Sequence, residues 1–274
     1  MSVSGTIARY VAAVLMAAGL FAGTIATAAD TADSGGSREE ILGEVVEKGE
    51  WISLFDGETL DGWSTKTVPE DQDYTWWRVV DGAIEANSME RGGDQDYVWL
   101  YSDEEFDDFV LRMKFQAFPD SPGNSGVQIR SRYDETDGDG WLNGPQIDIH
   151  PPGPWRTGMI WDETRGNQRW LYPEELEDGW VNESMAVDGV EFYYADDDPA
   201  WNDLEITAVG TKLQAVLNGV KVMEYDGDGV LDDENHQAHG VGLDGHLALQ
   251  IHTGDRLRIR FKDIFIQPLS IESE

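Results

Sequence analysis

The stretch LEITAVGTKLQAVLNGVKVMEY, residues 204–225, carries the clearest fold signal in the chain. It holds three short apolar runs, at 204–209, 213–217 and 220–225, and Asn218-Gly219 separates the last two. An Asn-Gly pair supplies the two positive φ angles that a type I′ turn needs. The stretch therefore predicts three consecutive β-strands, of which the last two form a tight hairpin.

The rest of the chain continues this pattern. Residues 110–115 alternate apolar and polar side chains, and residues 246–252 and 257–261 are expected to pair around the turn at 253–255. Segments rich in Gly, Pro, Asp and Asn separate these runs, and long amphipathic helical patterns are absent. Many short strands with frequent turns indicate an all-β sandwich of two antiparallel sheets.

The N-terminal region indicates export. A single basic residue, Arg9, precedes an apolar stretch that ends in small residues, which is typical of a signal peptide over residues 1–29. A retained membrane anchor is the alternative interpretation. Residues 30–48 are polar and acidic and are expected to be a linker, and residues 49–270 are expected to form one domain. Cleavage would leave no integral membrane domain, in a periplasmic or extracellular protein.

The charge balance limits the classes of partner that this protein can bind. The sequence has 54 acidic and 19 basic residues, a net charge of −35, and no cysteine. Nucleic acid is excluded as a partner because phosphate binding needs clustered Lys and Arg. An acidic surface adapted to salt is the simplest explanation, and ions should relieve its self-repulsion.

The segment QIDIH, residues 146–150, is the sharpest local signal for chemistry. In a strand, Ile147 and Ile149 would point to one side while Gln146, Asp148 and His150 point to the other. Polar groups on one face are costly to bury unless they pair with each other or with a ligand. A carboxylate beside an imidazole can hold its tautomer and raise its basicity.

Two further segments show the same polar-against-apolar alternation. Gln128 and Arg130 would share one face of a strand, and Gln250 and His252 would share one face of another. If these strands are neighbours in one sheet, their polar side chains form a single groove. The candidate catalytic residues are His150, Asp148 and Arg130. The candidate substrate-binding residues are Gln146, Gln128, Asn124, Trp155, Arg156, Gln250 and His252.

Other chemistries are less well supported. A two-carboxylate glycosidase needs a second acid across the bond, and the strand of Asp148 offers only Gln146 and His150 beside it. No cofactor is indicated with certainty. A divalent cation held by Asp148, His150 and His252 is an alternative that these residue types allow.

An ordered set of motifs resembles one family along residues 50–269. The motifs are WISLFDG (51–57), LDGW (60–63), WRVVDGAI (77–84), FDDFVL (106–111), NSGV (124–127) with Arg130, GPQIDI (144–149), LNG (217–219), LALQIH (247–252) and FKDI (261–264). Together they resemble the 3-keto-disaccharide hydrolase domain family. The segment HPPGPWRTG, residues 150–158, looks like one subgroup of that family.

The resemblance implies a concanavalin A-like jelly roll and activity on glycosides oxidised at C3. Such a ketone acidifies the hydrogen on C2, so a base can remove it and the C1 substituent can leave, by hydrolysis or elimination. His150 or Asp148 would then be the base, and Arg130, Arg156 or a cation would stabilise the enolate. A non-catalytic carbohydrate-binding module is the main alternative, and a glucanase-like hydrolase is a third.

Overall fold

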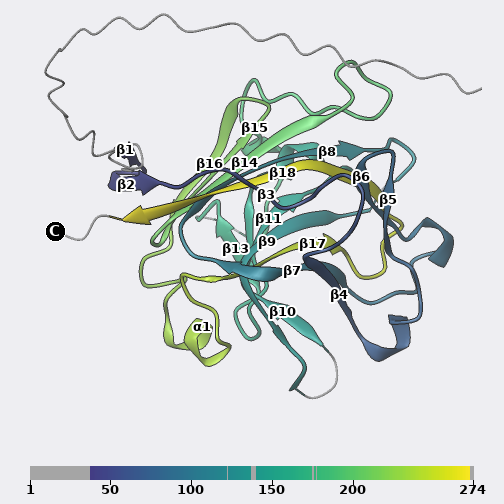
Figure 1. Ribbon diagram of the computed structural model, residues 1–274, viewed down its shortest axis with the longest axis horizontal. Coiled ribbons are helices and arrows are strands. Elements are labelled where there is room, and N and C mark those ends of the chain that lie inside the picture. Colours follow the sequence, from purple (N-terminus) through teal and green to yellow (C-terminus); the bar gives the residue numbers. More distant parts are fainter. Residues whose placement is uncertain (1–37, 122, 137–139, 175, 177, 272–274) are drawn as a thin grey trace, which may run out of the picture. The chain divides into compact units, whose positions relative to one another are not determined.

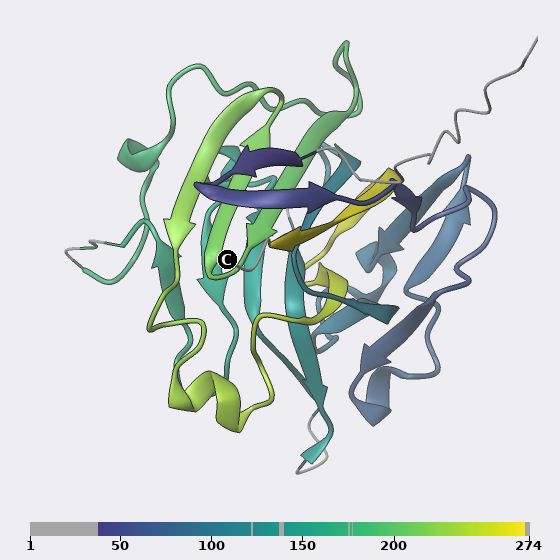
Figure 2. The same ribbon diagram turned by 60° about the vertical axis from the view of Figure 1, so that its left-hand side comes forward.

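The computed structural model describes residues 38–121, 123–136, 140–174, 176 and 178–271. The strands of this part of the chain form two antiparallel β-sheets (Figures 1 and 2). The chain divides into units 1–34 and 35–274, and every described residue lies in the second. The proposed signal peptide, residues 1–29, is outside the described residues. Among those described, no helix is both long and apolar enough to cross a membrane.

One sheet has ten strands. Its main path runs β1 (Arg38–Ile41), β2 (Glu44–Lys48), β18 (Arg258–Ile271), β8 (Phe109–Ala117), β14 (Asn202–Val209), β15 (Lys212–Leu217), β16 (Val220–Asp226). Three more strands, β3 (Ile52–Ser53), β5 (Trp77–Val80) and β6 (Ala83–Asn87), extend it beside β18. The sequence at 204–225 forms the meander from β14 to β16, and Asn218 and Gly219 have φ angles of 49° and 82°. The predicted hairpin is therefore confirmed.

The other sheet has eight strands. Its path runs β13 (Arg169–Tyr172), β12 (Ile160–Asp162), β11 (Pro145–Ile149), β9 (Ser125–Asp134), β17 (Gly245–Ile251), β7 (Val98–Phe106), β4 (Trp63–Thr67), and β10 (Trp141–Asn143) pairs with β9. The helical segments are short: α1 (Glu234–Ala238) and the 3₁₀ turns Pro69–Asp71, Met89–Arg91, Pro154–Arg156 and Glu183–Met185. The fold is the expected all-β jelly-roll sandwich of two antiparallel sheets.

The core lies between the two sheets. One apolar cluster contains Leu111 and Ile206 from the ten-stranded sheet and Ile147 and Leu249 from the eight-stranded sheet. Strand alternation sends every second side chain of β9, β11 and β17 into this core. The residues between them therefore project from the outer face of the eight-stranded sheet, and this face carries the candidate site.

Two expectations about the chain path were wrong. Strand β17 pairs with β7 and β9, whereas β18 belongs to the other sheet, so the turn at 253–255 links the two sheets and does not close a hairpin. Residues 38–48 are not a linker: β1 and β2 form a hairpin, and β2 pairs with the far end of β18. Val46 is fully buried there, against a partner strand that is distant in the sequence and that local composition could not reveal.

Candidate functional site

Strand β11 places two polar side chains on the outer face of the eight-stranded sheet. Ile147 and Ile149 are fully buried in the core, while Gln146 and Asp148 point the other way. Neighbouring β9 sets Gln128 opposite Gln146 and Gly126 opposite Asp148. A Cβ at Gly126 would lie only 2.5 Å from Cδ of Gln146, so this position has no room for a side chain.

Gln146 and Asp148 form one wall of a cavity of about 240 Å³. The strands β11, β9 and β17 are neighbours in one sheet, as the polar-groove expectation required. The cavity is lined by Tyr97, Asn124, Gln146, Asp148, Arg156, Trp161, Glu163, Gln168, Trp170, Trp180 and His252. Oδ1 of Asn124 and Oε1 of Gln146 are buried and have no hydrogen-bond partner within the described part of the chain. Buried amide oxygens of this kind are available to ligand hydroxyl groups.

A buried ion pair lies on the floor of the cavity. Nε of Arg156 donates to Oδ2 of Asp148 at 2.5 Å, and the Asp148 side chain is almost fully buried. Arg156 ends the short 3₁₀ turn 154–156, and its guanidinium lies 5.0 Å from the ring centre of Trp170. The pair uses Nε, and the two Nη groups carry the remaining donors of a rigid fork.

Glu163 is a second carboxyl group in the same cavity, and sequence analysis missed its role. It directly follows β12, and its backbone N–H donates to the carbonyl oxygen of Gly144 at 3.1 Å. Only 3% of Glu163 is exposed, and Oε1 accepts a hydrogen bond from Nε2 of Gln250 at 3.3 Å. The sequence signal for Glu163 was strand alternation after Ile160. This alternation places Trp161 and Glu163 on one face of the strand and Asp162 on the other face.

The environment of Glu163 changes its acidity. Burial raises its pKa to about 7, hydrogen bonds from Gln250 and Trp161 oppose part of this shift, and the charges of Asp148 and Asp162 add to it. A carboxyl group with a pKa near neutrality can both accept and return a proton at ordinary pH. The cavity therefore holds one carboxyl tied to a guanidinium and one carboxyl able to transfer protons.

Aromatic rings form the other wall. Trp161, Trp170 and Trp180 contact one another edge to face, with ring centres 5.2–5.8 Å apart. On the opposite side, the Tyr97 hydroxyl lies 3.1 Å from Nε2 of His252. Nδ1 of His252 lies 2.9 Å from the Thr253 carbonyl oxygen, which can only accept, so Nδ1 carries the hydrogen and Nε2 accepts from Tyr97.

The comparisons with known proteins agree with this architecture. The family model for the 3-keto-alpha-glucoside-1,2-lyase-like domain matches residues 50–267. The chain belongs to the 3-keto-disaccharide hydrolase domain family. No curated protein sequence matches it.

Solved structures of similar fold have low sequence identity to this family member. A provisionally named glycosyl hydrolase from Parabacteroides distasonis is 19% identical with a TM-score of 0.50, over 81% of this chain and 94% of that one. A second one from the same organism is 20% identical with a TM-score of 0.48, over 80% and 99% of the two chains. The carbohydrate-binding module CBM66 from Bacillus subtilis is 14% identical with a TM-score of 0.43, over 74% and 93%. At 19% identity, the similarity to the first of these structures supports the fold alone.

The fold of this chain does not bring Arg130 to the cavity. Arg130 has a φ of 49°, at an irregularity in the pairing of β9 with β17, which breaks the alternation assumed from the sequence. Its guanidinium binds the carbonyl oxygens of Asp107 and Gly210 and pairs with Asp108 at 2.9 Å. Arg130 is thus a buried structural ion-pair partner, and Arg156 supplies the guanidinium of the site.

Other predicted site residues lie around the cavity but do not line it. Nδ1 of His150 accepts from the Gly153 N–H at 2.9 Å, and burial, with the nearby Arg156 charge, lowers the pKa of His150. Gln128 is fully buried and donates to the Leu142 carbonyl oxygen at 3.1 Å. Gln250 does not line the cavity, but its Nε2 donates a hydrogen bond to Glu163, which does. Trp155 lines a separate apolar cavity with Met159 and Phe192.

The structure of this chain does not bring the proposed metal ligands together as a metal site. Within the described residues, no group of three or more His, Cys, Asp or Glu side chains could hold a metal ion. Asp148 is tied to Arg156, and each imidazole has a ring nitrogen engaged by its own loop. The suggested set of Asp148, His150 and His252 is therefore not a ligand set here.

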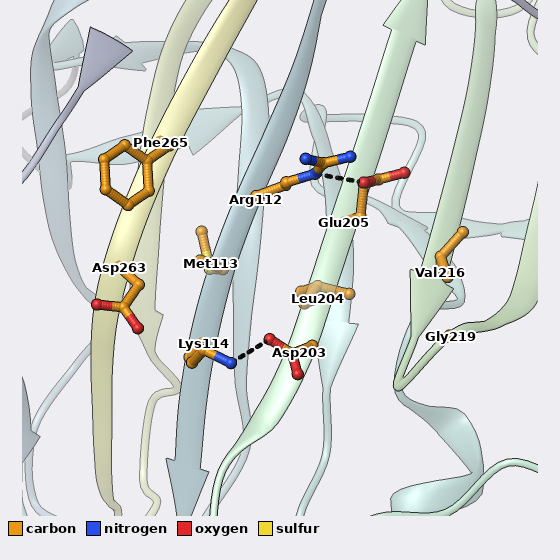
Figure 3. Close-up of a pocket in the computed structure, with 10 residues that line it drawn as sticks. All are labelled: Arg112, Met113, Lys114, Asp203, Leu204, Glu205, Val216, Gly219, Asp263 and Phe265. Carbon is orange, nitrogen blue, oxygen red and sulfur yellow. Dashed lines mark hydrogen bonds and ion pairs between the residues drawn. The ribbon is translucent and has the colours of Figure 1, made fainter. Parts of the chain in front are cut away.

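A larger hollow of about 350 Å³ lies over the ten-stranded sheet. Figure 3 shows Arg112 and Lys114 of β8 directed at Glu205 and Asp203 of β14, with which they form ion pairs of 2.6 Å each. Four of the charged groups that line it are thus already paired with each other. The cavity on the eight-stranded sheet is the candidate site.

Proposed function

We propose that this protein is an exported enzyme that cleaves 3-keto-glycosides by removing the C2 hydrogen and releasing the C1 substituent. The observation that carries the proposal is the buried Glu163 carboxyl, with a pKa raised to about 7, in a cavity that also presents the Arg156 guanidinium. The family assignment supports an oxidised glycoside as substrate.

The groups in the cavity have distinct roles in this proposal. Ionised Glu163 takes the proton from C2, and the C–H electron pair forms a C2–C3 double bond that places negative charge on the C3 oxygen. When this enolate collapses, the C3 carbonyl re-forms, the electron pair moves into the C1–C2 double bond and the C1–O bond breaks. The leaving oxygen takes a proton, which Glu163 can return because its pKa is near 7. The Nη groups of Arg156 stabilise the negative charge that develops on the C3 oxygen, and Asp148 positions Arg156. Water then adds to the double bond if the outcome is hydrolysis.

The cavity also suits a carbohydrate ring. Its volume of about 240 Å³ is below the range of roughly 300–1,000 Å³ for drug-sized ligands, so it fits one small ring. The amide groups of Asn124 and Gln146 offer partners for hydroxyl groups, and tryptophan rings face the apolar side of a sugar.

Replacement of Glu163 tests the proposal. With a 3-keto-glucoside as substrate, Glu163→Gln should lower kcat/KM by roughly 10²–10⁴-fold, the usual contribution of a general base. Deuterium at C2 should slow the parent enzyme if C–H cleavage limits the rate. Glu58→Gln is the matched control, because Glu58 is exposed and distant in sequence from the cavity residues, and it should match the parent.

Two other outcomes would reassign the chemistry. If His150→Ala abolishes aglycone release while Glu163→Gln retains it, His150 is the base and the Glu163 assignment is wrong. If the parent binds glycans but releases no aglycone from any keto-glycoside, the carbohydrate-binding module is the better description.

The geometry also favours testing a second function, a two-carboxylate glycosidase. Sequence analysis found no second acid, yet Glu163 and Asp148 line the same cavity. The ion pair with Arg156 occupies Asp148, which argues against its acting as nucleophile or base. Cleavage of the unoxidised parent glucoside at a rate comparable to that of the 3-keto form would favour the glycosidase.

The export part of the proposal rests on residues 1–29 of the sequence. Mature protein from the native host should begin near Ala29 or Asp30. N-terminal sequencing that finds residues 1–20 intact would refute it.

A further inference from the structure

The opening of the cavity is marked by its exposed lining residues. Gln168 and Trp180 are exposed, whereas Gln146, Asp148 and Glu163 are buried. The polar, proton-transferring end is therefore deep, and the way out passes Trp180 and Gln168.

Trp180 has unusual surroundings for a large apolar side chain. It is 56% exposed, yet its ring packs edge to face on Trp161 at 5.6 Å and on Trp170 at 5.8 Å. Trp170 is in turn backed by the Arg156 guanidinium. The indole is thus held in place by two rings while more than half of it remains open to solvent, which is the arrangement of a stacking platform.

The position of the reacting ring determines which part of the substrate contacts Trp180. This step rests on the proposed function: C2 and the C3 ketone must reach Glu163 and Arg156 in the deep part of the cavity. A cavity of about 240 Å³ is filled by that one ring, so the substituent on the adjacent C1 extends toward the opening. We propose that Trp180 and Gln168, the exposed residues of the lining, form the subsite for the C1 substituent, and that Trp180 selects substituents with a ring that has an apolar face.

Two kinds of substituent share this chemistry, an aromatic aglycone and a second sugar ring. Both present a flat apolar face to an indole, and Gln168 can hydrogen-bond to hydroxyl groups at its edge. A methyl group offers no such face. The platform should therefore discriminate by the size and flatness of the leaving group and leave the chemical step unchanged.

The test compares three 3-keto-glucosides, with a methyl, an aryl and a glucosyl substituent at C1. Trp180→Ala should lower kcat/KM for the aryl and glucosyl substrates by about tenfold or more, since one stacking contact of about 1.4 kcal/mol corresponds to tenfold. The methyl substrate should lose much less than the other two, and Trp180→Phe should restore most of the loss. Trp51→Ala is the matched control, because Trp51 is also partly exposed but stacks on Arg112 of β8 in the other sheet.

Equal losses for all three substrates, or no loss for any, would overturn the subsite. If the loss is confined to either the aryl or the glucosyl substrate, that substituent is the one the platform recognises. If the parent cleaves none of them, the proposed function fails but the platform is still tested by calorimetry with an unoxidised aryl glucoside. Trp180→Ala should then weaken binding by about tenfold, and unchanged binding would refute the platform.

Discussion

At the scale of single residues, the site depends on the different surroundings of two carboxyl groups in one cavity. Asp148 forms a direct ion pair with Arg156, whereas Glu163 is buried and receives only hydrogen bonds. Ion pairing favours the charged form of a carboxyl and burial favours the neutral form. In the proposed function, the first of these carboxyl groups positions Arg156 and the second transfers protons.

The raised pKa of Glu163 predicts a pH-dependent stability. Its folded pKa of about 7 exceeds the ordinary value of 4.5, so the folded state binds more protons between these two pH values and loses stability as pH rises through them. Glu163→Gln should therefore stabilise the protein at pH 8, by up to about 3 kcal/mol, and change little at pH 4. Urea unfolding at both pH values measures this, and an equal effect at both would contradict it.

At the scale of elements, helix α1 supports the strand that leads to Glu163. His236 of α1 is fully buried between Asp162, at the end of β12, and Asp233, which caps the helix. The distances from its ring nitrogens are 3.2 Å to Asp162 and 2.8 Å to Asp233. Burial lowers the pKa of His236, but the two carboxylates outweigh it and raise the pKa above its ordinary value.

This contact predicts that His236→Gln destabilises the fold through β12. A raised histidine pKa contributes stability that is complete below the unfolded pKa of about 6.5 and is lost as pH rises through the folded value. The variant should lose about 3 kcal/mol of unfolding free energy at pH 5.5, because it leaves Asp162 buried without its cation, and less at pH 9. Denaturant unfolding at the two pH values is the measurement. A loss independent of pH would show that the pKa of His236 is not raised in the fold.

At the scale of the whole molecule, the few basic residues are concentrated in ion pairs. Three of them, Arg78, Arg258 and Arg260, converge on the Glu85 carboxylate where β5, β6 and β18 meet. The sequence has 54 acidic residues and only 19 Lys and Arg, so acidic side chains far outnumber basic ones. Like-charge repulsion should therefore act across the surface.

The excess charge predicts stabilisation by salt. Raising KCl from low to molar concentration shortens the Debye length from tens of ångströms to about 3 Å, which screens repulsion between exposed carboxylates. The melting temperature should rise over this range. A melting temperature that stays flat or falls with KCl would argue against the explanation.

The sequence by itself determined the strands and much of the polar face. Period-two alternation is a local property, so it correctly separated Ile147 and Ile149 from Gln146 and Asp148, and Asn218-Gly219 identified its turn. The ordered motifs also identified the family. These features depend only on neighbouring residues or on their order along the chain.

Only the tertiary structure decided which groups form the site. The positive φ of Arg130 reverses its direction through an irregular strand pairing, which a periodic pattern cannot show. Glu163 looks like one acid among many until burial and Gln250, 87 residues away in the sequence, change its acidity. Desolvation and long-range hydrogen bonds arise only after the sheets have packed, because they depend on what surrounds a residue and not on what adjoins it in the chain.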